Sequence, residues 1–105
     1  MTLRTLYITC RDLEEAQSIA KTVVKERLAA CGNILPGMQS VYHWEGKVVE
    51  DSEVVLLLKT KVDLVDTLTK RVKELHSYDI PCIVSWIIDG GNKEYLNWIA
   101  AETQQ

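Results

Sequence analysis

The chain has 105 residues, enough for one domain with a modest hydrophobic core. Its 12 basic and 15 acidic residues give a net charge of −3 without any basic block, which argues against a nucleic-acid partner. The longest apolar runs, at 54–58 and 83–88, are far too short to cross a bilayer. The N-terminal residues lack the pattern of a signal peptide, so we expect a cytoplasmic protein with no membrane partner.

The three cysteines are Cys10, Cys31 and Cys82. Their odd number and wide spacing argue against a disulfide framework. No two of them form a CxxC pair, which argues against a structural zinc site. Each one is therefore expected first as a small buried apolar side chain.

The first segments predict a strand followed by a helix. Apolar and polar residues alternate over 3–10, which is typical of a half-buried strand. Asp12 then precedes Glu15 by three residues, as in a variant of the capping box. Apolar residues at helical spacing predict a helix over about 12–30, and Gly32 suits its exit. The inner face of the strand would carry Leu6, Ile8 and Cys10.

The middle of the chain predicts a long hairpin. A second strand runs over 33–44, where Pro36-Gly37 indicates a bulge or an edge position. Glu45-Gly46 offers a tight turn, and the chain returns over 47–50. The continuous apolar run at 53–59 predicts a central strand covered on both faces.

The last third predicts a helix, a strand and a short helix. Thr60 or Asp63 can start the second helix, whose apolar stripe runs to about His76. A strand follows over 82–88, and Asn92 can cap the last helix. The polar residues 102–105 read as a tail outside the structured part of the chain.

The order β-α-β-β-α-β-α predicts an α+β, ferredoxin-like fold. Its antiparallel sheet would carry both long helices on one face, with the short helix at the C-terminus. Val41, Tyr42 and Trp44 would lie on a segment near the sheet edge. Because a bare apolar edge promotes aggregation, we expect the sheet to extend between subunits in a closed ring.

Four motifs resemble those of the CutA divalent-cation tolerance family. They are Leu28-Ala29-Ala30-Cys31 with Asn33-Ile34 and Pro36-Gly37, then Ser40 to Gly46, His76 to Cys82, and Tyr95 to Trp98. The resemblance implies a single CutA-like domain over 1–105 and a homotrimer. It also implies a non-enzymatic response to metal ions, with binding of copper or another divalent cation and no organic cofactor. The trimer would be similar in architecture to PII signalling proteins, which is an analogy of fold alone.

The candidate metal ligands are His76, Cys82, Cys10 and Asp79. Cys82 stands where the family usually has Glu, and a thiolate would favour Cu(I) or Zn over harder cations. The same substitution is compatible with loss of the site. His76 also has a simpler interpretation, as a cation that stabilises the C-terminal end of a helix.

A second hypothesis is a PII-like small-molecule sensor or a trimeric scaffold. The residues expected to line a ligand cleft are Lys59, Tyr78 and Trp44, and those expected at the trimer interface are Val41, Tyr42, Trp44 and Trp98. In this hypothesis Lys59 binds an anionic metabolite. The alternative for Lys59 is an ion pair with an acidic side chain such as Glu53 or Glu45.

Overall fold

The computed structural model describes residues 2–105. The elements along this part of the chain are β1 (Leu3–Cys10), α1 (Leu13–Lys25), β2 (Cys31–Trp44), β3 (Lys47–Lys61), the short 3₁₀ helix η1 (Val62–Leu64), α2 (Val65–Leu75), β4 (Ile83–Ile88) and α3 (Lys93–Glu102). The order of strands and helices is the one that the sequence predicts.

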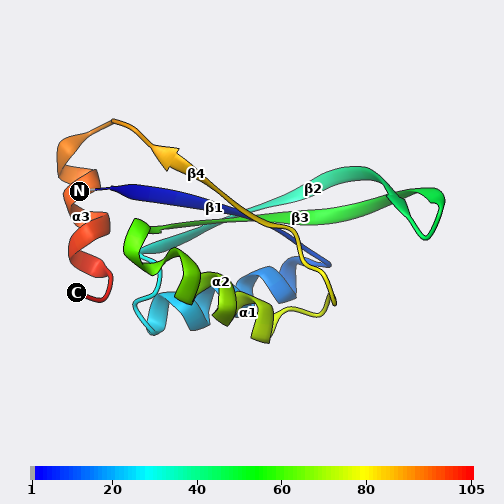
Figure 1. Cartoon of the computed structure of the whole chain (residues 1–105), viewed down its shortest axis with the longest axis horizontal. Helices are drawn as coiled ribbons and strands as arrows, with labels where there is room; N and C mark the ends of the chain where they lie inside the picture. The colour runs from blue at the N-terminus through cyan, green and yellow to red at the C-terminus, as the bar shows by residue number, and fades with distance from the viewer. Residues whose placement is uncertain (1) are drawn as a thin grey trace.

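The four strands form one antiparallel sheet in the order β2-β3-β1-β4. Helices α1 and α2 lie side by side on one face, and α3 packs at the end of the sheet (Figure 1). This arrangement confirms the predicted ferredoxin-like α+β fold.

The core lies between the sheet and helices α1 and α2. Leu6, Ile8 and Cys10 face it from β1 and are fully buried, as their alternation predicts. Strand β3 is central, but the prediction that it is covered on both faces is wrong for this chain. The helices shield only the face that carries Leu56, and Leu57 on the opposite face remains partly exposed. We call that opposite face the open face of the sheet.

A β-bulge in β2 sets which side chains reach the open face. Leu35 pairs with Val55, but the next paired residue, Met38, lies opposite Glu53. The extra residue is accommodated by Gly37, whose φ of +85° suits a residue without a Cβ. Since one inserted residue reverses the alternation, residues 38, 40, 42 and 44 all face the open side. The bulge and the edge position of β2 that Pro36-Gly37 predicts are both confirmed.

Helix α1 ends at Lys25, five residues earlier than the sequence predicts. Arg27 takes a left-handed backbone conformation with φ of +60°, which no helix continues. The Leu28 amide then donates back to the Val23 carbonyl, and the Ala30 amide donates to the Lys59 carbonyl of β3. The chain thus leaves the helix to join the sheet.

Helix α2 begins at Val65 rather than at Thr60 or Asp63. Thr60 belongs to β3, where it pairs with Arg4, and its buried hydroxyl donates to the Leu28 carbonyl at 2.7 Å. A hydroxyl used in this way is not available to cap a helix. Asp63 lies in η1.

The C-terminal residues are part of the fold, which corrects the prediction of a tail. Thr103 is only 2% exposed, and its hydroxyl donates to the Ile99 carbonyl. The Gln104 amide donates to the Arg27 carbonyl, and its side-chain amide donates to the Glu26 carbonyl, both at 2.9 Å. These bonds satisfy carbonyls that the early end of α1 leaves free.

Candidate metal centre

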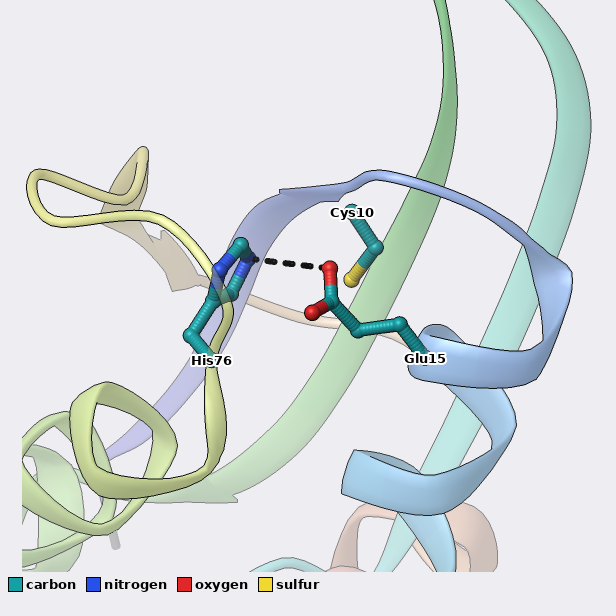
Figure 2. Close-up of side chains that lie close together, drawn as sticks. All are labelled: Cys10, Glu15 and His76. Atoms are coloured by element: carbon teal, nitrogen blue, oxygen red, sulfur yellow. Dashed lines mark ion pairs between the residues drawn. The ribbon is translucent and has the colours of Figure 1, made fainter.

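Three side chains meet at the C-terminal end of β1, on the side of the sheet that the helices cover. Cys10 ends that strand, Glu15 lies in the first turn of α1, and His76 follows α2 (Figure 2). One sulfur, one carboxylate oxygen and one imidazole nitrogen of this set lie within 4.8 Å of one another. The mixed S, O and N donors are of the kinds that bind zinc and related transition metals. We call these three residues the buried cluster.

Glu15 is held in place by two backbone donors. Asp12 caps α1 by accepting from the Glu15 amide, as the capping-box spacing predicts. The Glu15 carboxylate in turn accepts from the Arg11 amide and, through its other oxygen, from the Ser77 amide, both at 2.9 Å. Burial of this side chain opposes ionisation, but the hydrogen bonds from Ser77 and Arg11 outweigh it and lower the pKa of Glu15.

His76 has a fully buried side chain whose two ring nitrogens are both used. Nδ1 lies 3.1 Å from the Tyr78 amide, which can only donate, so Nδ1 is an acceptor. Nε2 lies 2.8 Å from the Thr9 carbonyl, which can only accept, so Nε2 carries the proton. The ring is therefore the neutral Nε2–H tautomer. Nε2 also lies 3.9 Å from Glu15 Oε1, the contact dashed in Figure 2.

Cys10 is fully buried, at 0% exposure. Burial, together with the negative charges of Glu15 and Glu53, raises the pKa of the thiol to about 12. Without a cation beside it, this thiol keeps its proton at neutral pH and behaves as a small apolar group.

The open face carries a groove of about 620 Å³. Tyr78 and Trp44, both expected in a ligand cleft, line it together with Cys82 and Asp79. The Tyr78 hydroxyl donates to the Glu53 carboxylate at 2.8 Å. Burial and this carboxylate raise the pKa of Tyr78 above its ordinary value.

The structure thus separates the four candidate metal ligands into two pairs. His76 and Cys10 belong to the buried cluster, whereas Cys82 and Asp79 lie at the groove on the other side of the sheet. Cys82 is exposed and Cys31 is half-buried, so the expectation of burial holds only for Cys10.

Glu15 was missed as a ligand because its spacing from Asp12 indicates a helix cap. That same spacing fixes its side chain at the N-terminus of α1.

Lys59 lies away from the groove. Its ammonium donates to Asn33 Oδ1 at 2.8 Å and to the Tyr95 hydroxyl at 3.4 Å, so an amide rather than an acid is its near partner. Tyr95 in turn stacks on Trp98, with ring centroids 5.6 Å apart. Trp98 and the hairpin residues Val41, Tyr42 and Trp44 are all substantially exposed.

Helices long and apolar enough to span a membrane are absent from residues 2–105. The longest helix in this range is α1, with 13 residues.

Fold and site together define a small ferredoxin-like domain with a buried cluster of three side chains whose types can bind a metal ion. The sequence matches the family described as CutA1 divalent ion tolerance protein over residues 4–102. The chain belongs to this CutA family. The family assignment made from the four sequence motifs is therefore confirmed.

Individual relatives agree in sequence and in structure. A protein of Thermus thermophilus named divalent-cation tolerance protein CutA is 51% identical over 93% of this chain and 95% of its own length. A solved structure from the same organism superposes with a TM-score of 0.94 at 48% identity, covering 97% of this chain and 99% of that one. A rice protein named Protein CutA 1, chloroplastic, is 44% identical over 95% of this chain, which spans only 56% of the rice protein's length.

Proposed function

We propose that this chain is a divalent-cation-responsive protein that binds the cation directly and catalyses no reaction. The observation that carries the proposal is the buried cluster. Its sulfur, oxygen and nitrogen donors converge within 4.8 Å in a member of a family named for cation tolerance. The buried carboxylate is the most telling member of the cluster, because such a group is costly to bury unless it is paired, hydrogen-bonded or bound to a metal.

The proposed cation is copper or another divalent transition metal. His76 and Cys10 are the proposed ligands that lie together, and Cys82 and Asp79 are proposed as groove-side donors. Thiolate and imidazole donors favour such metals over Mg²⁺ and Ca²⁺, which prefer oxygen.

The proposed assembly is a homotrimer located in the cytoplasm. Strands β2 and β4 form the two edges of the sheet, and the β2–β3 hairpin extends well beyond the helices (Figure 1). The open face exposes large apolar side chains, among them Trp44 at 50% and Trp86 at 48% exposure. A closed ring of copies would cover both the face and the edges, which supports the proposal.

Two measurements on the full chain test the proposal. Equilibrium dialysis of metal-free protein against Cu²⁺, Zn²⁺ and Mg²⁺ should give saturable binding for the first two ions only. Light scattering should give three times the subunit mass, and Trp44→Ser should lower it. His43→Ser is the matched control, since His43 adjoins Trp44 but points to the opposite face. If none of the three ions binds saturably, direct cation binding is contradicted. If the wild-type protein is monomeric, the trimer is contradicted.

The groove favours small-molecule sensing as a second candidate function. Its volume is within the range of ligand sites, and Trp44 and Tyr78 supply aromatic walls. Asp51, Glu53 and Asp79 make the lining acidic, so an amine suits it better than the anion expected from Lys59. A tryptophan-fluorescence titration with organic amines, compared with organic acids, tests this idea. A response to neither class argues against it.

A further inference from the structure

We propose that Cys10 Sγ, Glu15 Oε1 and His76 Nε2 form a charge-neutral site for a divalent zinc-type cation. The inference rests on the proposed function, because it names the atoms and the cation class for that cation-binding role. It excludes Cu(I) as the bound cation and Cys82 as a ligand of the primary site.

The donor atoms of the buried cluster lie a little farther apart than the ligands of a bound zinc ion. Bonds of about 2.0 to 2.3 Å at tetrahedral angles place two ligand atoms about 3.3 to 3.8 Å apart. The three donor atoms lie within 4.8 Å of one another, and the His76–Glu15 pair is at 3.9 Å. Side-chain movements of about 1 Å would therefore bring all three into bonding range.

The supports of Glu15 and Cys10 also match those of ligands at metal sites. Glu15 is fixed by the Arg11 and Ser77 amides, and it sits in the first turn of a rigid helix. Hydrogen bonds from outside the ligand set orient ligands in this way in known sites. Cys10 is fixed by its place in the register of β1, opposite Val54.

The charge of the set selects the oxidation state. A Cys10 thiolate and a Glu15 carboxylate carry two negative charges, and neutral imidazole adds none. A dication therefore leaves no net charge in a place where the His76 and Cys10 side chains have 0% exposure. A monovalent ion such as Cu(I) would leave one buried negative charge, which is costly.

Proton balance gives the site a measurable signature. Binding replaces the proton of the Cys10 thiol, and that proton goes to solvent. The His76 proton moves from Nε2 to Nδ1, so the ring stays neutral while Nε2 bonds to the metal. One proton is thus released for each cation bound. The shift also ends the hydrogen bonds of His76 with the Thr9 carbonyl and the Tyr78 amide.

The test is a Co²⁺ titration of the metal-free full chain, followed by displacement with Zn²⁺. We expect one ion per chain, a thiolate-to-cobalt charge-transfer absorption, and release of one proton measured by calorimetry in buffers of different ionisation enthalpy. Cys10→Ser should abolish the absorption, and Glu15→Gln should keep it while weakening binding by roughly 100-fold or more. Cys31→Ser is the matched control and should behave as wild type.

Three outcomes would overturn the inference, each recognisable. Absorption that survives in Cys10→Ser but disappears in Cys82→Ser places the site at the groove and leaves the proposed function intact. Saturable Co²⁺ binding by wild type without any thiolate absorption shows that Cys10 is not a ligand, and it too leaves the proposed function intact. Failure of wild type to bind any cation contradicts the proposed function as well. Circular dichroism checks that each variant folds. If Cys10→Ser does not fold, ¹⁵N NMR of His76 in wild type with Zn²⁺ decides, since the proton must appear on Nδ1.

Discussion

The Tyr78 hydroxyl donates a hydrogen bond of 2.8 Å to the Glu53 carboxylate, which joins the segment after α2 to the open face of β3. Glu53 is only 8% exposed. The two residues before Tyr78 bond on the side of the helices: His76 donates to the Thr9 carbonyl, and the Ser77 amide donates to the Glu15 carboxylate. Three consecutive residues thus connect the helix side of the sheet to its open face.

Tyr78→Phe should destabilise the protein by about 1–3 kcal/mol, because the Glu53 carboxylate loses its donor while it stays buried. Urea unfolding followed by circular dichroism measures the change. Tyr95→Phe is the control: its hydroxyl makes two long, solvent-exposed hydrogen bonds, to Cys31 and Lys59, so the expected loss is within about 0.5 kcal/mol. Equal losses in the two variants would show that the Tyr78–Glu53 bond has no special role.

The ion pair between Arg71 and Glu26 should make part of the stability depend on pH. Two bonds of 2.9 Å join the guanidinium on α2 to the carboxylate after α1. These bonds lower the pKa of Glu26 in the folded state. The stabilisation is therefore present above the unfolded pKa of about 4.3 and is lost as pH falls through the folded value.

Arg71→Lys tests this dependence, because lysine keeps the charge but cannot make both bonds. We expect a lower melting temperature than wild type at pH 7, and a difference that shrinks as the pH is lowered below about 4. High salt at pH 7 should shrink it as well. A difference that stays constant across this pH range would mean that packing of the arginine stem, rather than the carboxylate, is responsible.

Gly32 should be intolerant of any side chain because of a close approach of β2 to α1. A Cβ built at this position lies 3.0 Å from the Ala20 Cβ and 3.2 Å from a Leu58 methyl. Gly32→Ala should therefore cost about 1–3 kcal/mol. Ala20→Gly alone costs about 1 kcal/mol, because glycine is unfavourable inside a helix. The double variant should therefore lose less than the sum of the two single losses, and Gly90→Ala, with no atom within 4 Å, should be nearly neutral. Thermal denaturation of wild type and the four variants measures this; strictly additive losses would contradict the contact.

Local signals in the sequence predicted the elements well. Alternation over 3–10, the Asp12 and Asn92 caps and the Pro36-Gly37 bulge all depend on residues close together in the chain, and the structure confirms them. Contacts between distant segments were beyond these signals. Helix α1 ends early because Ala30 must reach Lys59 in the sheet, and no apolar pattern records that requirement.

The buried cluster was only half predicted for the same reason. His76 and Cys10 stood out by residue type, but Glu15 had a sufficient local explanation as a helix cap. Its approach to His76 follows from the packing of α1 beside α2. Cys82 lies beyond the turn that starts after His76 and directly precedes β4, whose first residue Ile83 pairs with Ile8. Its side chain lines the groove on the opposite face of the sheet.

The bonds from Gln104 to Glu26 and Arg27 also have a consequence for the order of events during synthesis. The turn after α1 leaves the ribosome early, but the hydrogen-bond donor of its Glu26 carbonyl, Gln104, is synthesised almost eighty residues later. Arg27 is also paired with Glu102 at 3.1 Å. The nascent chain therefore completes this turn only when α3 has emerged. Shortening the chain before Thr103 would leave the carbonyls of Glu26 and Arg27 without their hydrogen bonds from Gln104.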